Sequence, residues 1–343
     1  KNPQGKMKRN IFLFIYYKLY VGFKFLKFIK LYNPNFIVMG PDLVVNAIIS
    51  RYCEKKNIQL LIERLDENRR LYIKNKSFLD YLGILHDWSS DFVLKRKNVS
   101  LFVISKFLEK KYKLKYKNLK IYKAVTSMVD IEEFDDFSNK KFDEQMPETI
   151  ANSFYTKKIK LCFAGSCVFT NGLKFVLDCL AELKRLEINN FIYYMIFHKG
   201  YISEIREYVE KLNLVNNCII IEGVYPEYLP AVYKQCDILI LPEMGNIVAD
   251  AGFPGKTAEY LASGKVIIAT NFSDLSVHLK NNLNCKMSSI GDKIAYINNL
   301  IELINDEELR LKLGRVARET AEKEFNFINA IKPTIEVIYS NLV

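Results

Sequence analysis

The sequence predicts an α/β protein with two parallel sheets in tandem, and three observations support this fold class. Short apolar runs without polar alternation, such as 238–241 and 266–269, are typical of strands buried on both faces. Helix-length stretches separate these runs, so neighbouring strands should run parallel with right-handed crossovers. With 343 residues, of which 50% are hydrophobic and 26% charged, the chain is long enough for two hydrophobic cores.

The first half opens on an apolar and aromatic segment at 11–32 that contains four lysines. Lys18, Lys24, Lys27 and Lys30 lie inside it, which is unfavourable for a membrane-spanning helix. The last three share one helix face because of their spacing. Two interpretations stay open. The segment is either a basic amphipathic helix that lies on an anionic membrane, or a core helix with a lysine-rich solvent face.

Alternating strands and helices follow, and they predict the first parallel sheet. The strands are expected at 35–39, 58–62, 100–104 and 119–123, and the helices at 42–55, 77–97 and 105–111. Polar residues of mixed charge at 135–157 are interpreted as an interdomain linker. We therefore place the first domain at 1–150.

The second half repeats this alternation. Strands are expected at 160–164, 191–197, 218–222, 238–241 and 266–269, with a helix after each of the first four. The tail after Glu307 reads as helical, with a kink at Pro333. The second domain is placed at 151–330 and a final helix at 331–343.

The charge is divided unequally between the two halves. Residues 1–150 carry a net charge of +12 and residues 151–343 a net charge of −1. This asymmetry suggests an anionic partner for the first half, which could be a membrane surface, a lipid-linked phosphate or a nucleic acid.

The seven cysteines are scattered singly, without a C-x-x-C pair, at positions 53, 162, 167, 179, 218, 236 and 285. Several lie inside apolar runs. This pattern favours reduced, buried thiols in a cytosolic protein over a disulfide framework or a zinc site.

One stretch, 237–270, contains the residues with the clearest chemistry. Its buried strand ends at Pro242, and a polar, glycine-rich loop leads to a helix that begins near Lys256. Ligands of open α/β sheets bind at such carboxyl ends of strands. The helix start and Lys256 favour an anion. Glu259, in the first turn, can accept hydrogen bonds from a pair of hydroxyls, so the stretch predicts a nucleotide site.

Residues 253–266, FPGKTAEYLASGKV, resemble the F-P-x-K-x-x-E-Y-x-A-x-G-K-P signature of family 4 (group 1) glycosyltransferases. The segments 222–224 and 237–242 resemble the same family, as do 163–166 with 171–172 and 306–318. In the first half the resemblance is weaker and rests on 33–38, 103–105 and 129–134.

The resemblance implies a GT-B fold, in which two Rossmann-like domains face each other across a cleft. The second domain would hold the nucleotide sugar and the first the acceptor, and the final helix would cross back to the first domain. The donor-binding residues expected on this basis are Gly165, Ser166, Asn171, His198, Lys199, Gly223, Val224, Tyr225, Asp250, Pro254, Gly255, Lys256, Thr257 and Glu259. The expected catalytic residues are Lys256, Glu259 and Asp66.

Within this set the resemblance assigns separate roles. Glu259 would accept the ribose hydroxyls, the amides near Gly255 and the Lys256 ammonium would meet the diphosphate, and the loop at Val224 and Tyr225 would lie near the base. The family is typically retaining and metal-independent, and the sequence contains no D-x-D motif at a strand end. The departing diphosphate would then deprotonate the acceptor hydroxyl on the same face.

Several positions depart from the family pattern. Ala251 stands where many members have Glu, and the adjacent Asp250 is a candidate substitute. Ser166 and Asn171 stand where many members have Arg and Lys, which leaves Lys256 and Lys199 as the cations. We also expect the first αβ unit of the family, roughly 50–70 residues, to be absent from this chain.

The leading hypothesis is a retaining glycosyltransferase without a metal or cofactor, which moves a sugar from a UDP- or GDP-linked donor to a glycan or lipid-linked acceptor. It would act in cell-surface polysaccharide synthesis, in the cytoplasm at the inner face of the membrane. A degenerate, non-catalytic homologue that binds a sugar nucleotide or a partner enzyme is the alternative. A nucleic-acid-binding protein is a more remote one, because no recognition motif accompanies the lysines.

Overall fold

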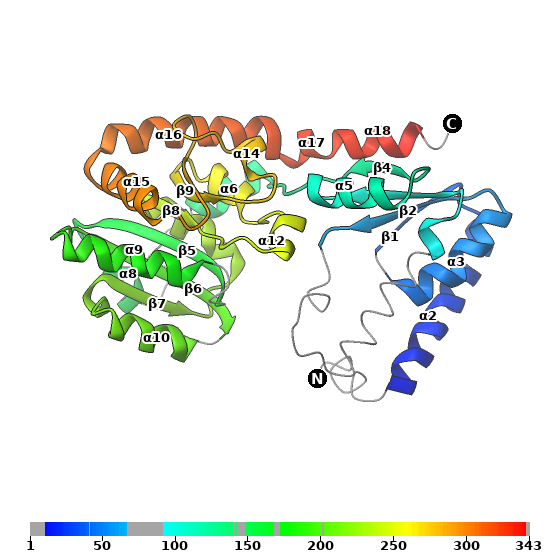
Figure 1. The fold of residues 1–343 in the computed structure, drawn as a ribbon, viewed down its shortest axis with the longest axis horizontal. Coiled ribbons are helices and arrows are strands. Elements are labelled where there is room, and N and C mark those ends of the chain that lie inside the picture. Colours follow the sequence, from blue (N-terminus) through cyan, green and yellow to red (C-terminus); the bar gives the residue numbers. More distant parts are fainter. Residues whose placement is uncertain are drawn as a thin grey trace. The chain divides into compact units, whose positions relative to one another are not determined.

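The computed structural model describes residues 11–40, 42–66, 92–139, 142, 148–167, 172–200 and 202–340. The chain divides into two compact units, which are residues 1–125 with 332–343, and residues 126–331 (Figure 1). Each unit is described by itself below.

The first unit contains a four-stranded parallel sheet with the order β1-β2-β3-β4. Its strands are β1 (Phe36–Met39), β2 (Gln59–Arg64), β3 (Val99–Val103) and β4 (Lys120–Lys123). Its helices are α2 (Ile11–Tyr32), α3 (Leu43–Lys55), α5 (Lys106–Lys115) and α18 (Lys332–Ser340). Asp42 and Ser105 cap α3 and α5, because their side chains accept hydrogen bonds from backbone N–H groups of the first turn.

Helix α2 packs on α3 along a narrow seam. Gly22 permits the close approach, since a Cβ there would lie 2.6 Å from Cδ1 of Ile48, and Ile29 is only 2% exposed. Lys18 pairs with Asp42, the N-cap of α3. Among the described side chains of α2, which begin at Tyr16, most other large apolar ones are exposed to solvent.

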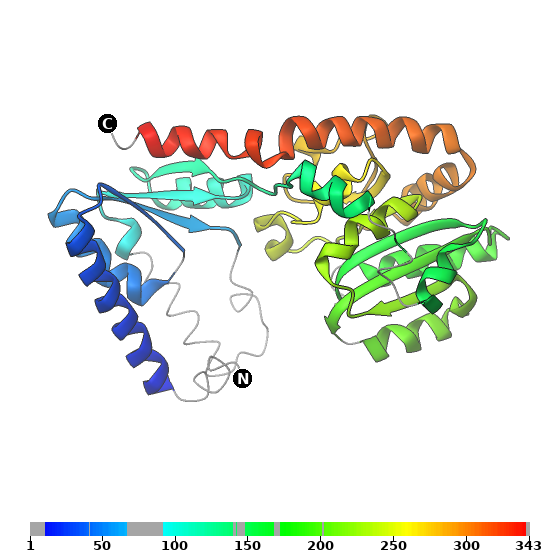
Figure 2. The same cartoon turned by 180° about the vertical axis from the view of Figure 1, so that it is seen from behind.

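The second unit contains a six-stranded parallel sheet with the order β10-β9-β8-β5-β6-β7. Figure 2 shows this unit from behind, mostly in green, yellow and orange. Its strands are β5 (Ile159–Cys167), β6 (Phe191–Gly200), β7 (Cys218–Glu222), β8 (Ile238–Leu241), β9 (Val266–Asn271) and β10 (Lys286–Ser289). The chain runs outward from β5 to β7 and then returns to β8, which pairs with the other side of β5. The strand order therefore reverses between β5 and β8, where α/β sheets open a crevice for ligands.

Helices cover both faces of this sheet. They are α6 (Ile131–Asn139), α8 (Glu148–Phe154), α9 (Leu173–Arg185), α10 (Ile202–Lys211), α11 (Leu229–Gln235), α12 (Ile247–Ala251), α13 (Thr257–Ala262), α14 (Leu275–His278), α15 (Lys293–Asn305), α16 (Glu307–Thr320) and α17 (Phe327–Ala330). Strand β5 shows the consequence of two covered faces. Cys162 and Ala164 belong to one hydrophobic cluster, and Leu161 and Phe163 to the other. This arrangement confirms strands without polar alternation.

The segment expected to be a linker is partly helical. Helices α6 and α8 begin and end within or near 135–157, and their buried residues Phe134 and Phe154 join the core of the second unit. Two hydrogen bonds of 2.9 and 2.6 Å join Arg318 to the Asp135 carboxylate. The division between the units follows Val125, ahead of the expected boundary at 150. The linker interpretation rested on polar composition and mixed charge, whereas α6 buries Ile131 and Phe134 against the second unit and tertiary contacts fix it there.

Three further features differ from the expectation. Strand β10 was not predicted, because it carries the polar residues Lys286 and Ser288, both buried. The loop after β8 contains the short helix α12. The tail breaks at Asn326, the N-cap of α17, and not at Pro333, which lies in the first turn of α18 where proline is tolerated. The helix expected at 77–97 lies mostly outside the described residues.

The cysteines conform to their expectation wherever their side chains are described. Cys53, Cys162, Cys179, Cys236 and Cys285 are buried free thiols, and Cys218 is a half-buried one.

Candidate functional site

The candidate site lies where β5 and β8 end, at the reversal of strand order. The exit of β8 is fixed to β9, because the Glu243 N–H donates to Oγ1 of Thr270 (2.8 Å) and that hydroxyl donates to the Glu243 carbonyl (2.7 Å). Helix α9 begins against the same exit at Gly172, whose φ is +76°. A Cβ on Gly172 would lie 2.8 Å from Cβ of Pro242, so only glycine fits both the conformation and the space.

The loop before α13 is also fixed by hydrogen bonds. The Pro254 carbonyl accepts from the Thr257 N–H (3.0 Å) and from the Thr257 hydroxyl (2.7 Å). The Ser127 hydroxyl donates to the Gly255 carbonyl (2.6 Å). Lys256 is therefore held at the start of α13 by a rigid loop. The side chain of Thr257 is fully buried, and its hydroxyl helps to hold this turn through the bond to Pro254.

Lys256 reaches across the end of β5. Its Nζ lies 3.9 Å from the centre of the Phe163 ring, and a Cβ on Gly165 would lie 2.5 Å from that nitrogen. Burial lowers the pKa of Lys256 to about 8, while Cys162 and the carboxylates of Glu243 and Glu259 act in the opposite direction. The site thus contains a cation in a poorly hydrated position.

Glu259 lies one turn further along α13. Burial raises its pKa, and a hydrogen bond from the Tyr233 hydroxyl (3.4 Å) together with the charge of Lys256 opposes that shift. A half-buried carboxylate held by one long hydrogen bond retains free lone pairs for a ligand. Perturbed pKa values of two neighbouring groups at a strand end are typical of functional sites.

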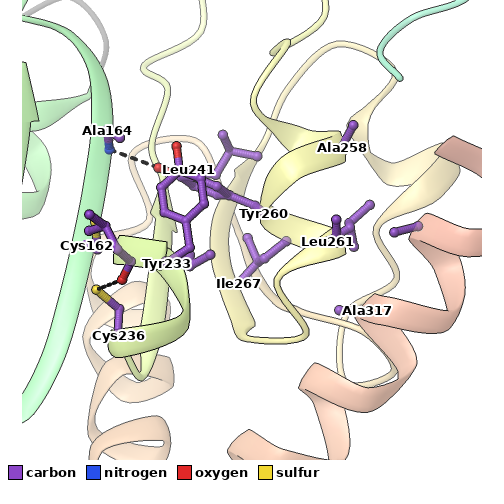
Figure 3. Packing of buried hydrophobic residues seen from close by; sticks show 14 of the residues in the cluster. Cys162, Ala164, Tyr233, Cys236, Leu241, Ala258, Tyr260, Leu261, Ile267 and Ala317 are labelled. Atoms are coloured by element: carbon purple, nitrogen blue, oxygen red, sulfur yellow. Dashed lines mark hydrogen bonds between the residues drawn. The ribbon is translucent and has the colours of Figure 1, made fainter. Parts of the chain in front are cut away.

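The buried face of α13 fixes the position of Lys256 and Glu259 relative to the sheet. The Ala164 N–H donates to the Tyr260 hydroxyl (3.0 Å), and the Tyr260 ring meets the Tyr233 ring edge-on at 5.1 Å (Figure 3). Leu261 points toward Ala317 of α16. Helix α13 is thus anchored to β5 on one side and to α16 on the other, with its polar start left at the sheet edge.

The other expected donor residues that the structure describes lie in two places, after β7 and in α12. Gly223 (φ +77°) lies at the end of β7, where its N–H donates to the Phe197 carbonyl (2.9 Å). Val224 packs against the core, whereas Tyr225 is 62% exposed. The Asp250 carboxylate accepts a hydrogen bond of 3.4 Å from the Ser273 N–H, which ties α12 to the turn after β9.

The remaining expected residues either lie in the first unit or have side chains outside the described residues. Asp66 belongs to the first unit, where it is exposed beyond the end of β2. Asn171 lies outside the described residues, and so do the side chains of Ser166, His198 and Lys199, whose backbones belong to β5 and β6.

Two residues of the site were not predicted from the sequence. Glu243 follows Pro242 at the end of β8, and an acid directly after a buried strand is a usable signal. Phe163 lies two residues before Gly165, and this spacing places both on one side of β5. The contact of Phe163 with Lys256 joins residues far apart in the sequence, so only the fold reveals it.

Comparisons with known proteins agree with this geometry. A family model described as "Glycosyl transferases group 1" matches residues 147–320, just over half of the chain. An uncharacterized glycosyltransferase of Methanocaldococcus jannaschii is 24% identical over 161 residues, which are 47% of this chain and 42% of that protein. The chain thus matches less than half of the length of this curated relative.

Several solved structures share the whole architecture. Sucrose-phosphate synthase from Thermosynechococcus elongatus has a TM-score of 0.71 at 14% identity, over 99% of this chain and 80% of that one. A glycosyltransferase from Rickettsia africae has a TM-score of 0.72 at 16% identity, over 95% and 81%. Anabaena HepE in complex with UDP has a TM-score of 0.69 at 12% identity, over 88% and 78%.

At these identities the likeness shows the fold, and the GT-B class expected from the sequence is confirmed. The family model also shows the family of the chain, because its match includes β5, β8 and α13 with Lys256 and Glu259. The chain belongs to the group 1 glycosyl transferases, a family of sugar-transferring enzymes.

Proposed function

We propose that this chain is a retaining, metal-independent glycosyltransferase that takes its sugar from a UDP- or GDP-linked donor. The observation that carries the proposal is the pair of half-buried groups, Lys256 and Glu259, at the reversal point between β5 and β8. A cation and a hydrogen-bond acceptor one turn apart match a diphosphate and the adjoining ribose. The UDP bound in the structure of Anabaena HepE supports a nucleotide in a fold of this kind.

In this proposal, different residues bind the diphosphate, the ribose and the base of the donor. The Lys256 ammonium meets the diphosphate, together with the backbone N–H groups beside Gly255, and the Glu259 carboxylate accepts from the two ribose hydroxyls. The exposed Tyr225 offers a ring on which the base can stack. Asp250 is already engaged with Ser273, so its role in donor binding is a weaker part of the proposal.

The proposed chemistry needs little covalent work from the protein. The bond from the anomeric carbon to the diphosphate oxygen breaks, and the acceptor oxygen bonds to that carbon on the same face. The acceptor proton passes to the departing diphosphate. Lys256 stabilises the charge that develops on this leaving group, which is the main catalytic contribution available to it. In this scheme the lysine acts in place of a metal ion.

The acceptor is a glycan or lipid-linked saccharide of cell-surface polysaccharide synthesis, and the first unit binds it at the cytoplasmic side of a membrane. The supporting observation is a stripe on α2, called here the α2 patch, at i, i+3 and i+4 spacing. It consists of Tyr20, Phe23, Lys24, Lys27, Phe28 and Leu31, which line a hollow of about 410 Å³. Exposed aromatic side chains interspersed with lysines favour an anionic lipid surface.

Among the described residues, no helix combines the length and apolarity needed to cross a membrane. The proposed contact is therefore peripheral. A vesicle-binding experiment tests this contact. If the chain does not bind vesicles of anionic lipid, a second copy of the chain or a partner protein covers the α2 patch instead.

Thermal-shift measurements with UDP, GDP and their sugars test the donor site. A nucleotide at 100 times its Kd should stabilise the chain by about 2.7 kcal/mol. Glu259→Ala should reduce this effect to about 1.4 kcal/mol at the same nucleotide concentration, since a roughly 10-fold weaker affinity leaves the ligand at about 10 times its Kd. Lys312→Ala, at an exposed lysine on α16, should leave the effect intact. If no nucleotide stabilises the chain, or if Glu259→Ala changes nothing, the assignment of the site is wrong.

Turnover distinguishes the enzyme from a non-catalytic homologue. Release of the nucleoside diphosphate in the presence of a saccharide acceptor, unchanged by EDTA, is the expected result. Binding of the nucleotide without turnover would favour the non-catalytic alternative. Steep salt-dependent binding to nucleic acid without nucleotide affinity would revive the remote one.

A further inference from the structure

Among the described residues of the second unit, Phe163 is a buried aromatic residue whose ring also contacts a charge. It is 1% exposed and belongs to the cluster that β5 shares with α9, while Phe197 of β6 lies 6.1 Å away between ring centres. The Lys256 ammonium lies 3.9 Å from the ring centre. The core thus holds the ring from one side, and a cation contacts it from the site.

The position of Gly165 makes this contact possible. Residues 163 and 165 face the same side of β5, and a Cβ on Gly165 would lie 3.1 Å from Cζ of Phe163 and 2.5 Å from Nζ of Lys256. Lys256 belongs to the loop before α13, whose buried residues pack on the opposite face of the sheet. Its side chain therefore crosses the end of β5 through the space that a glycine leaves open.

A desolvated ammonium needs compensation at this place. Burial lowers the pKa of Lys256 to about 8, although the carboxylates of Glu243 and Glu259 act in the opposite direction. The negative face of an aromatic ring supplies a further attraction, which is stronger where water is excluded. An aliphatic side chain of similar size would fill the same space without this attraction.

We propose that Phe163 is a positioning residue whose ring holds the Lys256 ammonium over Gly165, in the place where the donor diphosphate binds. This inference rests on the proposed function for the identity of the ligand, but the contact itself belongs to the unliganded chain. The ring reduces the freedom of a long side chain before the ligand arrives, so that less conformational entropy is lost on binding. Position 163 thereby influences donor affinity without touching the donor.

The first test measures Lys256 in the chain without ligand. The acylation rate of Lys256 is followed against pH by mass spectrometry in the wild type, in Phe163→Leu and in Phe197→Leu. Phe163→Leu should shift the midpoint of the Lys256 profile to lower pH, because the ammonium loses its ring. Phe197→Leu removes a neighbouring ring from the same core and should leave the midpoint unchanged.

The second test is a double-mutant cycle with UDP as the probe. Phe163→Leu should weaken UDP binding by about 3- to 30-fold, the range of a partly to fully desolvated cation–π contact. In the Lys256→Ala background, the same change should cost less than about 2-fold, because a residue that acts only through Lys256 has nothing left to position. Gly165→Ala should displace Nζ and behave like Phe163→Leu, although the added Cβ, 3.1 Å from Cζ of Phe163, also requires a small shift of that ring.

Either of two results would overturn the inference: an unchanged Lys256 profile in both Phe163→Leu and Gly165→Ala, or equal losses of UDP affinity with and without Lys256. If Phe163→Leu and Phe197→Leu shift the Lys256 profile equally, Phe163 acts only as a core residue and the inference is also wrong. Failure of the wild type to bind either UDP or GDP would contradict the proposed function instead, and the profile of the unliganded chain would still decide the role of Phe163.

Discussion

Helices α2 and α13 depart from the usual pattern of a globular helix in opposite directions. The outer face of α2 presents large apolar side chains to solvent, with Phe23 57% and Leu31 76% exposed. The start of α13 instead brings Lys256 and Glu259 into half-buried positions. Exposed apolar patches and buried charges both cost stability, and each therefore indicates a ligand.

The difference between the two helices indicates what each would bind. Under the proposed function, the α2 patch is covered by a large apolar surface from outside, and its lysines favour an anionic one. Under the proposed function, the charges of α13 bind a small anionic ligand, because they lie at the carboxyl ends of two neighbouring strands, where α/β sheets bind ligands. One helix thus fits a surface and the other a molecule.

The largest expected effect is that of Lys256→Met. Removing the cation should weaken UDP binding by about 10- to 100-fold, the size of a lost charged hydrogen bond. The same change should raise the Tm of the unliganded chain by about 2–4 °C, because an apolar side chain replaces a poorly hydrated charge. Calorimetric titration and thermal melting measure the two effects. A lower Tm together with unchanged affinity would contradict the role of Lys256.

The α2 patch should respond to a reversal of its charges. Lys24→Glu with Lys27→Glu should reduce binding to vesicles of anionic lipid by at least about 30-fold, at ~1 kcal/mol for each lysine lost. UDP affinity should not change. Lys312→Glu with Lys323→Glu, two exposed lysines of the second unit, is the matched control. Equal losses from both pairs would mean that only net charge matters.

A smaller effect is expected at Glu259. Loss of the ribose 2′-hydroxyl should cost the wild type about 10-fold when 2′-deoxy-UDP replaces UDP, since a hydrogen bond to a charged acceptor is lost. Glu259→Gln should bind both nucleotides with similar, weaker affinity. Comparison of the two Kd values in each protein measures this discrimination. If Glu259→Gln still prefers UDP, another group binds the ribose.

The smallest expected effect is a pH dependence. Because the pKa of Lys256 is lowered to about 8, its ammonium is lost as pH rises through that value, and UDP affinity should fall about 3- to 10-fold between roughly pH 7 and 9. A bound diphosphate favours the ammonium, so binding near pH 8 should take up protons. Titrations in buffers of different ionisation enthalpy detect this uptake.

The same shift predicts a change in stability with a definite sign. The unfolded lysine, with its ordinary pKa of 10.5, binds more protons than the folded one above about pH 8. Unliganded stability should therefore rise between about pH 8 and 10.5 relative to Lys256→Met. A flat profile would show that Lys256 is better hydrated than its surroundings indicate, and the opposite slope would show that the nearby carboxylates outweigh its burial.

Much of the fold follows directly from local sequence pattern. Runs such as 238–241 predict strands buried on both faces, and β8 (Ile238–Leu241) occupies that range with every residue buried. Strand β10 was missed, since its buried Lys286 is bonded to Glu302 of α15, and such a partner is not visible in a four-residue window. The same holds for α6, whose Asp135 is bound by Arg318 from a distant helix.

The candidate site also has features that the local sequence predicts and features that only the fold reveals. The sequence by itself determined that Lys256 and Glu259 share the first turn of a helix behind a buried strand, because this depends on spacing alone. Only the tertiary structure decided that β5 and β8 are neighbours, that Gly172 packs against Pro242, and that Lys256 crosses Gly165 to reach Phe163. Strand order and side-chain reach are set by how the whole sheet assembles, so no local pattern contains them.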